Sequence, residues 1–303
     1  MSHLEPLGQE AQETLNRGYQ LELAGPQDFN RHALAKIRSD VRKIEATWMA
    51  HELQSMRFRD LPSKVEDFES WYRSCFHEQL LAAENYFDHL ANFSCFEELA
   101  IYVLYEELVD GRFDDVIALA QLGLKGRAKL ALASNFWDEM GEGDEKQMHT
   151  FLFQNSAEFF RIELSQTSLM SLVKPNAEAL ANGNLLLMLA IRRENSARLL
   201  GALTLLEHTA PKRFARVAAA MRRLKLPEEI IYYHELHVRV DAKHGDDLLH
   251  IVLLPMLREH PRLLHEVATG VLLRLQVANR YYEMLASVRE SLLGLLNERQ
   301  VLP

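Results

Sequence analysis

Apolar residues recur at spacings of three and four along almost the whole chain, a period typical of amphipathic helices and not of strands. Glycine and proline, which interrupt regular structure, are sparse, with 13 and 9 residues respectively. Most of them fall between the periodic stretches. The pattern therefore predicts an all-α protein whose core is made by helices alone.

Turn-forming residues divide this pattern into about ten helices. The Ser94 hydroxyl, with Glu97 three residues later, has the spacing at which two side chains cap the start of a helix. The expected interruptions between helices are Gly25–Pro26, Leu61–Pro62, Asp110–Gly111, Lys125–Gly126, Gly141–Gly143, Pro175–Asn176, Asn182–Gly183, Pro211 and Pro227.

The chain shows no repeat of solenoid length and no low-complexity tract, which favours one helical bundle over a repeat array. We expect a core domain at 93–303 and a helical extension at 1–92 packed on it. The extension and the apolar stretch 271–296 are candidates for the surface of a homodimer. With 303 residues, 48% of them hydrophobic, a large buried core is within reach.

Charge and targeting signals exclude several classes of protein. Acidic residues outnumber basic ones by 43 to 34, and no basic block is present, so nucleic acid is not an expected partner. The longest nearly uninterrupted apolar run, 185–191, is too short to span a membrane, and the N-terminus lacks a leader pattern. Cys75 and Cys95 form no metal-binding or disulfide motif. We therefore expect a cytoplasmic protein.

The clearest candidate ligands lie on one predicted helix. His237, Asp241 and His244 fall within about 60° of one another around its axis. Two neutral nitrogen donors and one anionic oxygen suit a divalent transition metal such as iron. His234 lies one turn earlier on the same face, as a further ligand or as a hydrogen-bond partner of one. The alternative is a histidine-rich surface helix without a metal.

Three further acids and one histidine are weaker candidates. Glu139 and His149 are separated by Gly141 and Gly143, which allow the chain to break and bring both side chains to one point; the alternative is an ordinary acidic loop.

Glu207 continues an apolar stripe, where a carboxylate is costly unless it is paired or metal-bound; the alternative is a helix end at which it reaches water. Glu106 or Glu107 faces inward from a helix whose buried stripe runs through Leu99 and Val103.

Together these segments resemble the haem-oxygenase-like di-iron oxidases and oxygenases, often described only as iron-containing redox enzymes. The resemblance covers about Phe96 to Leu249. It implies a haem-oxygenase-like helical bundle that holds two Fe(II) ions per chain so weakly that a purified sample loses part or all of them. His234, by its spacing, and Tyr105, next to Glu106, are candidate supporting residues behind the ligands. The implied iron ligands are Glu106, Glu139, His149, Glu207, His237, Asp241 and His244.

The resemblance also implies an O2-dependent oxidoreductase that oxidises a small organic molecule, with amino-acid-derived compounds and fatty acids as candidate substrates. An electron donor is a further candidate partner, whereas neither nucleic acid nor membrane is expected.

Other readings of the chain have less support. A ferritin-like bundle needs Glu-x-x-His pairs, and no histidine here has a glutamate three residues before it. A metal-free thiaminase-like enzyme of the same fold needs an activated cysteine, for which neither cysteine has a recognisable context. Haem binding would leave most of the ligand-type residues unexplained. The alternative from a different class is a non-catalytic helical interaction protein.

Overall fold

The computed structural model describes residues 8–56 and 60–301, which form helices and contain no strand. The all-α prediction is thus confirmed. None of the helices in these two ranges combines the length and the apolar character that a membrane crossing requires. The α-helices are α1 (Gln9–Glu22), α2 (Arg31–Ser55), α3 (Val65–Phe93), α4 (Phe96–Asp110), α5 (Phe113–Ala120), α6 (Gly126–Glu139), α7 (His149–Ser165), α8 (Ala177–Ile191), α9 (Ser196–Arg223), α10 (Glu228–Asp247), α11 (Leu254–Glu259) and α12 (Leu264–Val301).

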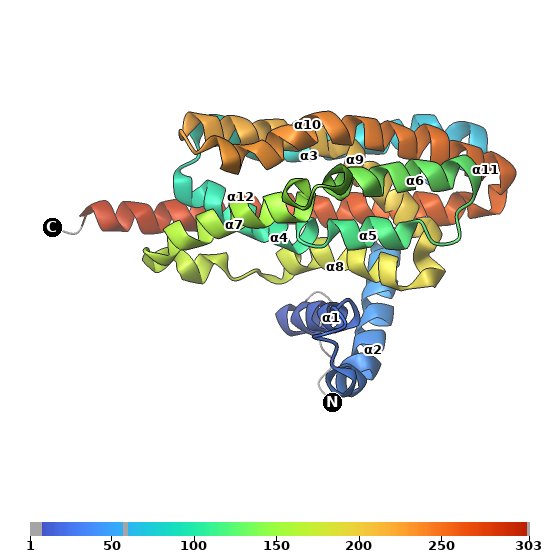
Figure 1. Ribbon diagram of the computed structural model, residues 1–303, viewed down its shortest axis with the longest axis horizontal. Helices are drawn as coiled ribbons and strands as arrows, with labels where there is room; N and C mark the ends of the chain where they lie inside the picture. Colours follow the sequence, from blue (N-terminus) through green and yellow to red (C-terminus); the bar gives the residue numbers. More distant parts are fainter. Residues whose placement is uncertain (1–7, 57–59, 302–303) are drawn as a thin grey trace.

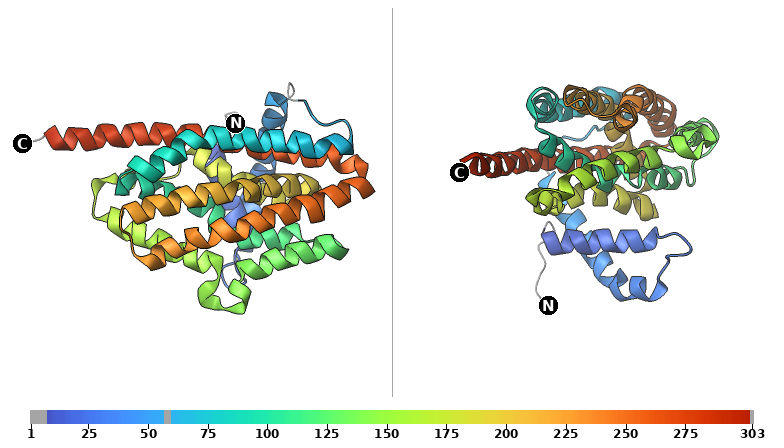
Figure 2. Two further views of the ribbon diagram at one scale, coloured as in Figure 1. Left: turned by 90° about the horizontal axis from the view of Figure 1, so that it is seen from above. Right: turned by 60° about the vertical axis from the view of Figure 1, so that its left-hand side comes forward.

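Helix α9 is the centre of the bundle and packs against α3, α8, α10 and α12 (Figure 1). Helix α10 continues through a π-helical turn, Leu248–Leu253, into α11. Helices α6 and α7 cover α10 on its other side, joined by two 3₁₀ turns at Gly141–Gly143 and Glu145–Gln147. Seen from above, the long helices run side by side, and α12 extends beyond the others at its C-terminal end (Figure 2).

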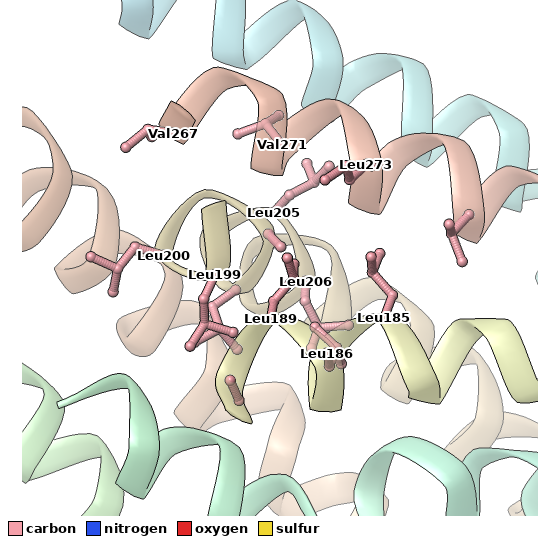
Figure 3. Close-up of a cluster of buried hydrophobic side chains, with 14 of the residues drawn as sticks. Leu185, Leu186, Leu189, Leu199, Leu200, Leu205, Leu206, Val267, Val271 and Leu273 are labelled. Atoms are coloured by element: carbon pink, nitrogen blue, oxygen red, sulfur yellow. The ribbon is translucent and has the colours of Figure 1, made fainter. Parts of the chain in front are cut away.

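The apolar core beside α9 explains why this helix holds a fixed position. Leucines of α8 and α9 interlock with valines and leucines of α12, and all of them are buried (Figure 3). Each such side chain contributes about 1.5–3 kcal/mol when it leaves water. Helix α9 is apolar almost all round from Leu199 to Leu206, the pattern of a central helix, so the residue that follows, Glu207, is carried into the interior.

The N-terminal helices attach to the bundle through buried charges. The Arg192 guanidinium, at the end of α8, bonds Glu22 of α1 at 2.6 Å and Glu45 of α2 at 2.9 Å. Helix α3, which the sequence places in the extension, lies along α9 and α12. The division at residue 93 stays a prediction.

Two predicted helix breaks are wrong, because both lie inside helices. Gly183 falls within α8, where the missing side chain lets α8 approach the main chain of α4: a Cβ there would lie against the carbonyl oxygen of Leu108. Pro211 falls within α9. Proline removes one helical hydrogen bond without ending the helix when tertiary packing holds both sides.

The predicted cap at Ser94 is also wrong. The Ser94 hydroxyl donates to the carbonyl of Leu90 at 2.6 Å, so it closes the end of α3 instead of starting α4. Cys95 is the residue before α4, and its side chain makes no capping hydrogen bond. The predicted breaks at Gly141–Gly143 and before Glu228 are confirmed.

The close approach at Gly183 gives a stability prediction. Gly183→Ala should lower the free energy of unfolding by about 1–3 kcal/mol, because α8 must move away from α4. Gly294→Ala is the matched control: its Cβ meets nothing within 4 Å, so the variant should be unchanged or up to about 1 kcal/mol more stable. Urea unfolding followed by circular dichroism measures both, and equal stabilities would contradict the packing role.

Candidate metal centre

The three residues of α10 singled out by spacing all point into the bundle. His237, Asp241 and His244 are buried. They face α7 and α9, which pack along α10. A carboxylate and two imidazoles thus share the interior face of one helix, and the surface-helix alternative is excluded.

These residues take part in two clusters of potential ligands. Glu139 and His149 join His237 in the first triad, and Glu207 joins Asp241 and His244 in the second. Within each triad, one nitrogen or oxygen from every residue lies within 4.8 Å of the others. Since His237 and Asp241 are one helical turn apart, about 5–6 Å, the two triads are neighbours.

Local structure explains how Glu139 and His149 come together. Helix α6 ends at Glu139 and α7 begins at His149. Gly141, Glu142 and Gly143 have φ angles of 60°, 53° and 94°, a left-handed run that turns the chain back on itself. A Cβ at Gly141 would lie against the main chain of Gln147 and Met148. The glycines therefore bring Glu139 and His149 to one point, as the sequence predicted.

In the first triad the donor atoms converge without bonding to one another. Glu139 Oε2 and His149 Nδ1 are 3.0 Å apart, yet His149 Nδ1 makes no hydrogen bond. The rings of His149 and His237 meet edge to face, with centroids 4.5 Å apart. A buried carboxylate oxygen and an imidazole nitrogen at this distance could both coordinate one cation.

Hydrogen bonds to neighbouring groups orient the two histidines of α10. His237 Nδ1 donates to the Tyr233 carbonyl at 2.8 Å, which leaves Nε2 as its lone-pair nitrogen. His244 Nε2 donates to Asp138 at 2.9 Å, which leaves Nδ1 facing Glu207 and Asp241 at 3.8 and 4.0 Å. Such outer contacts to histidine are characteristic of metal sites.

Glu207 is oriented in the same way. The Asn135 amide donates to Glu207 Oε1 at 2.9 Å, and Glu207 is only 1% exposed. The alternative that Glu207 reaches water from a helix end is therefore wrong, because α9 continues past it to Arg223.

Burial raises the pKa of two carboxyl groups of the second triad, because their neighbours neutralise them only in part. Burial, opposed by the charge of His244, raises the pKa of Glu207 to about 7. Burial and the nearby acids Glu207 and Glu139 raise the pKa of Asp241 well above its usual range. Burial and the charge of His149 depress the pKa of His237, which keeps that imidazole neutral. A cation would stabilise every one of these ligand forms.

Glu106, the candidate ligand on α4, lies outside the two triads. Glu106 is buried, and its carboxylate bonds the Tyr281 hydroxyl at 2.6 Å and the Arg213 guanidinium, outside both triads. Glu107 instead pairs with Arg161 at 2.7 Å near the surface, so Glu106 is the inward acid. Its role as a ligand stays a prediction.

The two residues predicted to support the ligands lie in different places. The Tyr105 hydroxyl donates to the Leu172 carbonyl at 2.7 Å, away from the triads. His234 is buried against the rings of Phe214 and Tyr233. Burial and the charge of Arg213 lower the pKa of His234 to about 3, so its ring stays neutral.

Sequence reasoning missed three residues of the site. Asp110 lies one turn after Glu106 and lines one small cavity with Glu207, His237 and Asp241. Burial raises the pKa of Asp110 to about 8, and its Oδ2 has no partner. The spacing of four from Glu106 was the available signal. Asp138 and Asn135 were visible only as neighbours of Glu139.

The small cavity also limits what can bind. Its volume is about 10 Å³, which leaves no room for a porphyrin. The residues that surround it are suited to bare ions, since neutral imidazole and carboxylate are ligands that iron accepts.

Comparison with known families agrees with this geometry. The model of a haem-oxygenase-like family, described as iron-containing redox enzyme, matches residues 101–279, more than half of the chain. The chain belongs to the family of iron-containing redox enzymes. The match runs from α4 into α12 and includes both triads. It confirms the resemblance inferred from the sequence and a redox function in general terms. No curated protein matches the chain.

Protonation of the triads predicts a pH-dependent affinity for metal. Because the pKa of Glu207 is about 7 and that of Asp241 is raised, metal must displace protons below neutral pH. The affinity for Mn(II), which O2 does not oxidise in neutral buffer as it does Fe(II), should rise by at least about tenfold per pH unit from pH 6 to pH 7. Calorimetric titration measures this, and an affinity independent of pH would contradict the assignment.

The contact between His244 and Asp138 gives a second prediction. Burial opposes a charge on His244, but the hydrogen bond to Asp138 and the acids Glu207 and Glu139 outweigh it and raise its pKa. Asp138→Ala should weaken Mn(II) binding by about 10–100-fold, because His244 loses its orientation. Asp40→Asn, at an exposed position of α2, is the control. Binding as tight as that of the control would show that Asp138 has no such role.

Proposed function

We propose that the protein is an O2-dependent, non-haem iron oxidoreductase that holds two iron ions per chain and oxidises a small organic molecule. The observation that carries this proposal is the pair of adjacent buried triads, each with carboxylate and histidine ligands. Membership of an iron-containing redox family supports it independently. O2, a small-molecule substrate and an electron donor are the partners that the proposal requires.

One ion would be held by Glu139, His149 and His237, and the other by Glu207, Asp241 and His244. Asp110, at the edge of the same cavity, is a further candidate ligand. When bound, iron supplies the one-electron chemistry that none of these side chains has.

The protein's own residues keep this site dry. Aromatic rings of Phe153, Phe214 and Tyr233 pack beside His237 and its neighbours, where they exclude water. Without a metal ion, burial raises the pKa of Asp110 to about 8, so this carboxyl group carries a proton that a bound ion would displace. Asp110 lies at the edge of the cavity that His237 and Asp241 line.

Anaerobic loading with Fe(II) tests the proposal. Equilibrium dialysis against excess Fe(II) should give two bound Fe(II) per chain by elemental analysis, and exposure to O2 should then consume oxygen as the iron oxidises. His237→Ala should lose most of this iron and abolish the O2 consumption, while its circular dichroism stays unchanged. His265→Ala, at an exposed position of α12, is the control and should behave as the parent protein.

Two outcomes would contradict the proposal. Failure of the folded parent protein to bind Fe(II) at equilibrium would favour the non-catalytic interaction protein. Retention of iron and O2 consumption by His237→Ala would show that these triads are not the site.

A further inference from the structure

A second cavity lies on the other side of α9. It has a volume of about 360 Å³ and opens between α3 and α9, which run side by side. We call it the α3–α9 cleft: α3 lines it between His77 and Asp88, α9 between Thr209 and Arg216, and α12 with Tyr282. This volume is within the range of small-molecule sites. No residue of either triad lines the cleft.

A polar group inside the cleft lacks a partner. Gln79 is 1% exposed, and its amide nitrogen donates to the Thr209 hydroxyl at 3.2 Å and to the Tyr282 hydroxyl at 3.4 Å. The other atom of the amide, Oε1, is buried and accepts no hydrogen bond. Since buried carbonyl groups in proteins nearly always accept a hydrogen bond, a ligand with a donor group would complete this one.

The α9 wall of the cleft carries positive charge. Asp88 pairs with Arg216 at 2.5 Å, but Lys212 has no ion-pair partner within the described ranges 8–56 and 60–301. Arg213 lies deeper and bonds Glu106. Behind it, the buried Arg274 bonds only the neutral Asn182 amide, and its Nε is unpartnered. Burial and the charge of Arg213 lower the pKa of Arg274. Glu106 thus bonds Arg213, whereas no carboxylate bonds Arg274 among the described residues.

The opposite wall has a different character. Leu80, Ala83 and Phe87 of α3 line it with apolar surface, and Glu84 adds one carboxylate without an ion-pair partner among the described residues. Gln79, Lys212 and Arg213 all line this one cleft, so an unpartnered acceptor and two cationic side chains border the same small volume. An acceptor and a cation are the two groups that recognise the ammonium and the carboxylate of an amino acid.

We propose that the α3–α9 cleft is a binding site for an apolar α-amino acid, separate from the metal centre. The carboxylate faces Lys212 and Arg213, the ammonium group donates to Gln79 Oε1 on the side of Glu84, and the apolar side chain packs on Leu80, Ala83 and Phe87. Because Arg213 also lines the small cavity beside the triads, an occupant of the cleft contacts a residue of the metal pocket.

Calorimetric titration of the full chain without metal tests this site and does not depend on the iron proposal. L-Leucine should bind one per chain with a Kd between about 10 μM and 1 mM. 4-Methylpentanoate, which lacks the ammonium group, and L-leucinamide, which lacks the carboxylate, should each bind at least about tenfold more weakly.

Two variants assign the binding to the cleft. Lys212→Met should weaken L-leucine binding by about fivefold or more and leave L-leucinamide binding unchanged. Gln79→Leu should abolish the preference for L-leucine over 4-methylpentanoate. His237→Ala, in the metal centre, and Lys43→Met, an exposed lysine of α2, should both bind L-leucine as the parent protein does.

Absence of saturable L-leucine binding would overturn the proposal. Equal affinity for L-leucine and 4-methylpentanoate would overturn it as well, as would binding that neither Lys212→Met nor Gln79→Leu changes. Loss of binding in His237→Ala would move the ligand to the metal centre and likewise end the proposal for the cleft.

Discussion

The structure depends on one electrostatic constraint: three carboxylates and three imidazoles meet in one buried volume between α6, α7, α9 and α10. Without a cation, the carboxylates repel one another and lose their hydration, and the raised pKa values of Glu207 and Asp241 record that cost. Hydrogen bonds hold individual members in place: the Asn135 amide donates to Glu207, His244 donates to Asp138, and His237 donates to the Tyr233 carbonyl. Such an arrangement disfavours the metal-free state, and a bound cation would relieve it.

The rest of the bundle provides the stability that this centre lacks. The leucine-rich contacts of α8, α9 and α12 are far less polar than the faces of α9 and α10 that meet at the triads. Helix α9 takes part in both, with an apolar first half and Glu207 at its middle. In enzymes, a well-packed apolar core commonly supports a destabilising cluster of buried polar residues beside it.

Local sequence predicted most of the residues of the two triads, and where it left a choice open, tertiary packing made the decision. His237, Asp241 and His244 were legible because helical periodicity alone puts them on one face. Glu207 was ambiguous because its burial depends on α9 continuing past Pro211, which only tertiary packing decides.

Other features needed distances that sequence does not contain. Asp110 was missed because its closeness to Glu207 depends on how α4 packs in the bundle. Gly183 suggested a break because a glycine that ends a helix and one that lets two helices touch look alike in sequence. The Arg213 contact that occupies Glu106 links positions about a hundred residues apart, beyond any local pattern.

The turn between α6 and α7 has a mechanical consequence. Glu139, His149 and His237 come from three helices, so an ion shared by them would cross-link the chain as a disulfide does, closing a loop of about a hundred residues. The left-handed run at Gly141–Gly143 is the corner of that loop. Loss of the ion would remove this cross-link, and the turn alone would then join α6 to α7.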